Sequence, residues 1–403
     1  MPSRRDLLKL ALAAAGAASV PRRAVAASVR PGGPRYFVSI FLSGGIDPIY
    51  TTDPKVRADV EPWVDVPYGP DAILDAGAIR LGPHFAPLAP LAPRLAILNG
   101  IALRTANHNT GSEQFLRMKT GTRPEMPSLL QLLGQHRDGQ AVGCVDWLFG
   151  AAQFSRLFDA THAGELQLLA TQLRAQARRL RDGVRAESRV TAGSLEESAE
   201  LFDRVAALGP PRYQRWTEEG AQTAPLAVSL QRTLWMIEND LARGVELNVG
   251  GLDQPWDTHT FNAERQASAS APVALIARFL GELERRRSAR GSLAAQTLVV
   301  MGSEIGRFPG LNTQHGKDHF PEAPCVLFGA GVNAGDGKGA VYGRTGKKME
   351  AAPLSLRTGR DAAVNGHTVL LDDLGATLLY LGGVSDPSVY GYDGRVLEFL
   401  VGA

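Results

Sequence analysis

Residues 294–306 of the chain read AAQTLVVMGSEIG. A short apolar run that passes directly into glycine and polar residues is typical of a buried β-strand. The residues before it, 269–286, read ASAPVALIARFLGELERR and repeat apolar side chains at helical spacing. A helix followed by a fully apolar strand is typical of a parallel sheet with helices on its faces. This stretch therefore predicts an α/β fold.

The same alternation of strands and helices recurs along the chain. Apolar strand-like runs occur at 36–41, 95–101, 245–250 and 324–332, and the run at 367–383 predicts a late helix. Residues from about 160 to 243 instead form long, charge-rich helical stretches. We therefore expect one domain over 28–403, a doubly wound, mostly parallel sheet with helices on both faces and a helical insertion at about 160–243.

The N-terminal stretch predicts export. Residues 1–27 read MPSRRDLLKLALAAAGAASVPRRAVAA, with twin arginines, a short apolar run and a small-residue end near Ala26. This pattern resembles a twin-arginine export signal, whose machinery would carry the folded protein to the periplasm or the medium. A basic amphipathic helix is the alternative. The apolar run is too short to span a membrane, so we expect no membrane span in the mature chain.

Charge and cysteine content narrow the class further. The chain carries a formal charge of +2, and residues 1–27 contain five basic residues and one acid, so the remainder has +2 − 4 = −2. The mature chain thus gives no electrostatic reason to expect nucleic-acid binding. The two cysteines, Cys144 and Cys325, both lie in apolar strand-like runs. We expect two buried thiols rather than a disulfide.

Acidic and imidazole side chains gather beside the predicted strands. In parallel sheets, working groups collect beyond the carboxyl ends of the strands. Each group alone has a structural explanation, such as a helix cap, an ion pair or a surface turn. Together they predict a site for one or two divalent ions, Zn²⁺, Mn²⁺ or Ca²⁺. The candidate residues are Asp47, Asp257, His259, Glu304, His315, Asp318 and His319.

Six segments in order also resemble a known family. They are FLSGGID, HNTGSEQFLRMKTG, WDTH, VVMGSEIGR, GKDHFP and DDLGATLLYLGG, spread over about residues 35–398. This order is similar to the domain-of-unknown-function 1501 family (DUF1501), whose members are exported proteins placed in the alkaline phosphatase and sulfatase superfamily. The resemblance implies a doubly wound sheet with a two-metal site for phosphate or sulfate esters.

The resemblance also implies roles for individual residues. Asp47 and Glu304 would bind one ion, and Asp257, His259 and His319 would bind the other. Asp318 would orient an imidazole, and His315 receives no role. One departure is Ile305, which stands where the superfamily usually has a second ligand, an imidazole.

The nucleophile is the other departure. Counting back from Thr120 and Gly121 by the superfamily spacing reaches Gly111, which has no side chain. Of its neighbours, Thr110 could attack the substrate, whereas Ser112 could attack or serve as a helix N-cap. His108 could be a further metal ligand or a general acid.

Two functions follow from these patterns. The first is an exported metal-dependent hydrolase that acts on small-molecule or polymer phosphate or sulfate esters. The alternative is a catalytically inactive envelope protein that keeps the fold and binds a metal or an anionic ligand. Gly111 and Ile305 favour the alternative, because each removes a group that catalysis would use.

Overall fold

The structure is a computed structural model of the 403-residue chain. It describes residues 33–123, 126–136, 142–146, 163–182, 186–209, 211–250, 255–262, 268–288, 290–362 and 364–402. The expected export signal at 1–27 lies outside these residues. Within the described part of the chain, no helix has the length and apolar character that crossing a bilayer requires.

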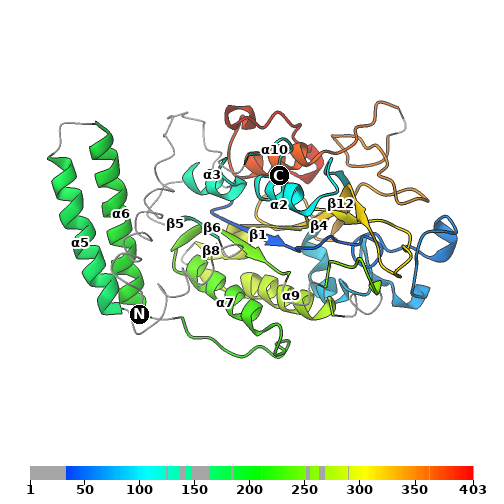
Figure 1. The fold of residues 1–403 in the computed structure, drawn as a ribbon, viewed down its shortest axis with the longest axis horizontal. Coiled ribbons are helices and arrows are strands. Elements are labelled where there is room, and N and C mark those ends of the chain that lie inside the picture. Colours follow the sequence, from blue (N-terminus) through cyan, green and yellow to red (C-terminus); the bar gives the residue numbers. More distant parts are fainter. Residues whose placement is uncertain are drawn as a thin grey trace.

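A seven-stranded sheet forms the centre of the molecule (Figure 1). It is mostly parallel, because only β12 runs antiparallel to both of its neighbours, β4 and β9. The predicted mostly parallel α/β sheet is thus confirmed. In spatial order the strands are β13 (Ala340–Tyr342), β4 (Leu95–Ala102), β12 (Glu322–Gly329), β9 (Thr297–Gly302), β1 (Tyr36–Phe41), β6 (Ala242–Asn248) and β5 (Val142–Asp146).

The three central strands end together. In the ladder between β1 and β9, Phe41 lies opposite Gly302, and between β1 and β6 it lies opposite Asn248. Every residue of β1 and β9 is buried, which explains why these strands read as continuous apolar runs. Their carboxyl ends therefore form one edge, from which three loops start side by side.

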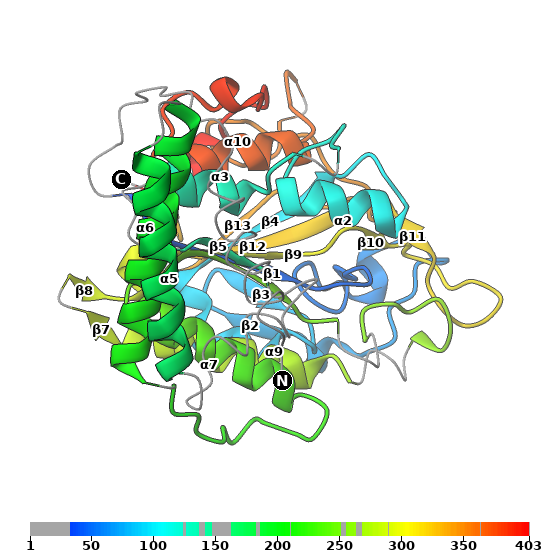
Figure 2. The same ribbon diagram turned by 60° about the vertical axis from the view of Figure 1, so that its left-hand side comes forward.

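Helices cover both faces of the sheet (Figures 1 and 2). On one face lie α2 (His108–Arg117), α3 (Leu129–His136) and α10 (Leu371–Leu381). On the other lie α7 (Ala224–Glu238) and α9 (Ser270–Arg285). The apolar side of α9 is buried, as its sequence pattern predicts.

The predicted helical insertion separates into two parts. Helices α5 (Ala163–Arg181) and α6 (Ala186–Leu208) pack on each other and project beyond β5 at the side of the sheet (Figure 1). Their contact buries Leu173, Ala177 and Leu195. By contrast, α7 packs against β6 and α9 and so belongs to the layer that covers the sheet.

Short elements complete the fold. The two-stranded sheets pair β2 (Leu74–Ala76) with β3 (Ile79–Leu81), β7 (Arg287–Ser288) with β8 (Gly291–Ser292), and β10 (Gly306–Arg307) with β11 (His319–Phe320). The 3₁₀-helices are η1 (Arg57–Asp59), η2 (Pro70–Ala72), η3 (Ala86–Arg94), η5 (Ala294–Gln296), η6 (Pro387–Tyr390) and η7 (Glu398–Leu400).

Cys325 is a buried free thiol on β12, and burial raises its pKa to about 12. Cys144 lies on β5, and the strand order puts β9, β1 and β6 between the two cysteine-bearing strands. Adjacent strands lie about 5 Å apart, so the two backbones are too distant for a disulfide. The expected buried thiol is confirmed at Cys325.

Candidate metal centre

The direction of β12 brings further segments to the edge where β1, β6 and β9 end. Because β12 is antiparallel, its first residue Glu322 lies opposite Ala102, the last residue of β4. The hairpin that precedes β12 and the loop that follows β4 therefore reach this same edge. Four stretches of chain can place side chains there: the loops after β1, β4 and β6, and the single connection from β9 to β12 that contains the hairpin.

Three histidines from these stretches form a cluster. His108 opens α2 after β4, His259 follows β6, and His319 lies in β11 just before β12. One ring nitrogen from each lies within 4.8 Å of the others. The Nε2 atoms of His259 and His319 are 2.7 Å apart. The His259 side chain is 43% exposed, so molecules from solvent can reach the cluster.

The opposite nitrogen of each ring faces an oxygen. His108 Nδ1 is 2.7 Å from Glu304 Oε1, and His319 Nδ1 is 2.6 Å from the carbonyl oxygen of Ala106. His259 Nδ1 is 3.5 Å from Asp318 Oδ1. Carbonyl and carboxylate oxygens only accept hydrogen bonds, so in a neutral ring this environment favours the tautomer with the proton on Nδ1. The three Nε2 atoms are then left with lone pairs.

This arrangement fits a divalent cation. Lone pairs that face each other at 2.7 Å repel unless a proton or a cation lies between them. Histidines that bind metals almost always donate their other ring N–H to a carboxylate or a backbone carbonyl, as these three do. His108 Nε2 is buried without a hydrogen-bond partner among the described residues. Burial also lowers the pKa of His319, which favours its neutral, metal-binding form.

The Glu304 carboxylate fixes the orientation of the His108 ring. It lies two residues after β9, and its side chain is 1% exposed. Besides facing His108, Oε1 accepts a hydrogen bond from the Gly44 amide at 2.8 Å, and Oε2 lies 2.7 Å from Ser303 Oγ. The sequence predicts Glu304 as a direct ligand, whereas here its carboxylate reaches the cluster through the His108 imidazole.

Gly111 allows α2 to approach Glu304. A Cβ at Gly111 would lie 2.5 Å from the Glu304 carbonyl oxygen, which is too close for any side chain. Gly111 is three residues after His108, so both face the same side of the helix. The stacked rings of Phe41 and Phe115, 4.8 Å apart, fix α2 over β1. Because position 111 has no side chain, α2 can approach the Glu304 backbone closely enough for His108 to contact the Glu304 carboxylate.

Asp257 lies at the rim of the cluster. Its Oδ1 is 3.7 Å from His259 Nε2 and 4.0 Å from His108 Nε2. It also accepts a hydrogen bond from the buried guanidinium of Arg307 at 2.7 Å. Arg307, three residues after Glu304 in the chain, thus forms an ion pair with Asp257. Asp257 is thus placed to act as a fourth ligand or as a proton acceptor.

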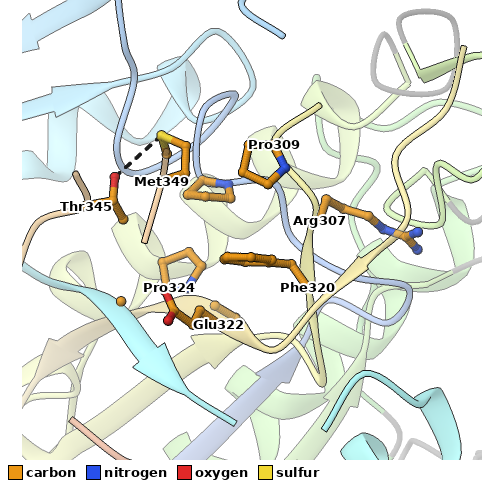
Figure 3. A pocket seen from close by; sticks show the side chains of 10 residues that line it. Arg307, Pro309, Phe320, Glu322, Pro324, Thr345 and Met349 are labelled. Atoms are coloured by element: carbon orange, nitrogen blue, oxygen red, sulfur yellow. Dashed lines mark hydrogen bonds between the residues drawn. The ribbon is translucent and has the colours of Figure 1, made fainter. Parts of the chain in front are cut away.

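Arg307 also lines a small pocket. The pocket is lined in part by Pro309, Phe320 and Met349 (Figure 3). In that view the Arg307 guanidinium points away from them. It donates instead to the carbonyl oxygens of Trp256 and Lys317, at 3.1 and 2.9 Å. His319 and Phe320 are adjacent in β11, so their side chains point to opposite faces of that strand, and it is Phe320 that lines the pocket.

Asp47 forms an ion pair with a buried lysine. Its carboxylate is buried and lies 2.7 Å from the ammonium nitrogen of Lys317. Its other oxygen accepts a hydrogen bond from the Ile49 amide at 3.0 Å. The structure therefore pairs Asp47 with a lysine, outside the group of three histidines. Asp318 is 62% exposed and reaches the cluster only through His259.

The candidate nucleophiles lie around the start of α2. Asn107, not Ser112, is the N-cap, because its side chain accepts from the Thr110 amide at 3.1 Å. The N-cap interpretation of Ser112 is therefore wrong. Thr110 is exposed and Ser112 is half-buried. Thr110 is two residues from His108, so it points away from the face that carries the histidine.

Sequence reasoning gave no site role to Arg307 or Lys317. Both lie inside the quoted motifs SEIGR and GKDHFP. The signal available was a basic residue one to three positions from a candidate ligand, which is common on protein surfaces. His315 is exposed and has a positive φ of 55°. It remains without a role.

The model of the family DUF1501, described as a protein of unknown function, matches residues 214–399. This range contains Asp257, His259, Glu304 and His319 but neither Asp47 nor His108. A search of curated proteins finds no match.

Three solved structures are similar at low identity. A crystal structure of Ps i-CgsB in complex with k-i-k-neocarrahexaose is 12% identical, with TM-score 0.40, over 90% of this chain and 75% of that one. The PsFucS1 sulfatase from Pseudoalteromonas sp. is 12% identical, with TM-score 0.39, over 100% and 77%. A TAB5 alkaline phosphatase mutant with Mg bound in its M3 site is 10% identical, with TM-score 0.34, over 78% and 95%. Similarity at this level assigns no activity to this chain.

Proposed function

We propose that this protein is a metal-dependent hydrolase of phosphate or sulfate esters, with one divalent ion held by His108, His259 and His319. The observation that supports it is the common orientation of the three rings. Each Nδ1 meets an oxygen, and the Nε2 atoms face one another. Three imidazole ligands favour Zn²⁺ or Mn²⁺ over Ca²⁺, which prefers oxygen ligands.

The residues around the ion would divide the remaining tasks. A divalent ion at this position would polarise an ester oxygen and lower the pKa of a water. Asp257 can accept the proton of that water, and Arg307 holds its carboxylate in place. Glu304 keeps the His108 imidazole in the tautomer that presents Nε2.

Water is the proposed nucleophile. The chain leaves no side chain between α2 and Glu304 at position 111, and Thr110 lies on the exposed side of the helix. Ser112 is one turn after His108 and half-buried, so it is the hydroxyl that best competes with water. The export signal expected at residues 1–27 would place this hydrolysis outside the cytoplasm.

The proposal is tested by metal analysis together with turnover of aryl phosphate and aryl sulfate esters. We expect about one Zn²⁺ or Mn²⁺ per purified chain and hydrolysis that chelation abolishes. His319→Ala should lose both the ion and the activity. His315→Asn is the matched control, since it removes an exposed imidazole four residues away and keeps a residue that tolerates positive φ.

Equal metal content in the His319→Ala and His315→Asn proteins would refute the histidine centre. Activity that survives Thr110→Ala and Ser112→Ala alike supports water as the nucleophile. Gly111 and the absence of its side chain favour a second function, a metal-binding protein without catalysis. A bound ion with no turnover of any ester would support that second function.

A further inference from the structure

Lys317 is a fully buried cation next to the metal centre. Its side chain is 0% exposed, and its ammonium nitrogen lies 2.7 Å from Asp47 Oδ2 and 3.5 Å from Asp65 Oδ2. The same nitrogen lies 5.5 Å from the centre of the Tyr50 ring. A buried ammonium group is costly unless it is paired, and here two carboxylates and an aromatic face surround it.

The backbone of Lys317 ties this charge to the histidine-bearing segments. Its amide donates to the Thr258 carbonyl at 2.7 Å, next to His259. Its carbonyl accepts from Arg307, whose guanidinium also bonds Asp257. Lys317 is also two residues before His319. Hydrogen bonds through Thr258, Arg307 and Asp257 thus connect the segment that carries Lys317 to the segments that would hold the proposed ion.

The two acids around Lys317 have the character of a divalent-ion site. Asp47 and Asp65 supply two carboxylates from different loops, and oxygen ligands of this kind bind Mg²⁺ or Mn²⁺. The family resemblance implies a second ion bound by Asp47. The observed residues do not fit that ion, because the Asp47 carboxylate is already neutralised by Lys317.

We propose that the Lys317 ammonium takes the place of a second divalent cation, held by Asp47 and Asp65, so that the centre binds a single ion. The inference rests on the proposed function for the ion at the histidines. Lys317 is a positioning residue, since it supplies a fixed charge and holds the two loops that carry His259 and His319.

Lys317→Met tests the inference, because methionine has a similar length and no charge. At the same free Mn²⁺ concentration, we expect the variant to bind one more Mn²⁺ per chain than the wild type after equilibrium dialysis. Added Mn²⁺ should also raise the Tm of the variant more than that of the wild type. The double variant Asp47→Asn/Lys317→Met should show neither gain, because the carboxylate that holds the extra ion is gone.

Equal Mn²⁺ counts in the wild type and Lys317→Met would overturn the inference, and so would two ions in the wild type. A purely structural lysine would destabilise the fold on substitution without any gain of metal. If Lys317→Met does not fold, the ion count of Asp47→Asn tests the inference instead. A count equal to that of the wild type supports the inference. The loss of an ion would show that Asp47 is a ligand and would refute the inference. A wild-type protein that binds no metal would refute the proposed histidine site. It would not refute the inference about Lys317, because the extra Mn²⁺ bound by Lys317→Met is measured separately.

Discussion

At the histidine cluster, one proton on each ring determines what the residues can bind. An oxygen acceptor at Nδ1 fixes the neutral tautomer whose Nε2 carries a lone pair. For His108 that acceptor is Glu304, for His319 the Ala106 carbonyl, and for His259 Asp318. Metal affinity of the proposed site should therefore depend on residues that do not touch the ion.

Glu304→Gln tests this dependence. A glutamine amide keeps the size of the side chain but removes the charge that anchors His108 Nδ1–H. We expect metal affinity to fall about 10- to 100-fold, measured by competition with a chromophoric chelator. Glu322→Gln is the control, because Glu322 is half-buried and, like Glu304, accepts a hydrogen bond from a backbone amide, that of Ala351 at 2.8 Å. Equal affinities of the two variants would remove Glu304 from the site.

Among the elements, α2 places the candidate ligand His108 at the edge of the sheet. Its N-cap Asn107 starts the helix, Phe115 packs on Phe41 of β1, and Gly111 lies against the Glu304 backbone. A helix that touches both β1 and the end of β9 can bring His108 over Glu304. The close approach needs a glycine because the space for a Cβ is filled by backbone.

Gly111→Ala should therefore displace the helix. The added methyl would lie 2.5 Å from the Glu304 carbonyl oxygen. We expect the free energy of unfolding to fall by about 1–3 kcal/mol and metal affinity to fall with it. Gly281→Ala in α9 is the control, since a Cβ there meets nothing within 4 Å. This control substitution should raise the free energy of unfolding by up to about 1 kcal/mol, and urea unfolding measures both variants. Similar effects of both alanines would contradict a role for close packing at 111.

Across the whole molecule, the two ends of the sheet carry different groups: the histidine cluster at one end and a network of ion pairs at the other. The carboxyl ends of the central strands carry the histidine centre, and the amino ends are held by Asp240. Its carboxylate accepts from Arg35 at 2.7 Å and from the Tyr36 hydroxyl at 2.8 Å, which join β1 to the start of β6. Stability and metal binding should therefore be separable by mutation.

Asp240→Asn tests this separation. Burial opposes ionisation of Asp240, but hydrogen bonds from Arg35, Arg243 and Tyr36 outweigh it and hold the pKa well below the usual 3.8. A depressed folded pKa stabilises the fold above about pH 4, and this contribution is lost as pH falls further. We expect the free energy of unfolding to fall by about 1–2 kcal/mol at pH 7, a range that already allows for the partial exposure of Asp240. The decrease should be smaller near pH 3.

The control is Asp361→Asn, whose pair with Arg344 lies on the surface and should contribute less than about 1 kcal/mol. Urea unfolding at both pH values measures the free energies, and metal content should stay at the wild-type value in both variants. A loss for Asp240→Asn that does not change with pH would show that ionisation of Asp240 is not its cause.

The sequence alone determined the elements and their chemistry. Continuous apolar runs such as Thr297–Gly302 define buried strands, and amphipathic runs such as Ser270–Arg285 define covering helices, because burial follows hydrophobic periodicity. The acids and imidazoles beside those strands also follow from the sequence, since the strands of a parallel sheet share one edge.

Tertiary structure decided which of those groups meet. Only the antiparallel direction of β12 brings His319, which precedes its strand, to the edge where other strands end. Asp47 and Lys317 are 270 residues apart, and the fold pairs the Asp47 carboxylate with the Lys317 ammonium group. His108, one of several candidates from sequence, lies against Glu304 because Gly111 allows α2 to approach the Glu304 backbone. Strand direction and charge pairing depend on contacts distant in sequence, and local patterns do not encode them.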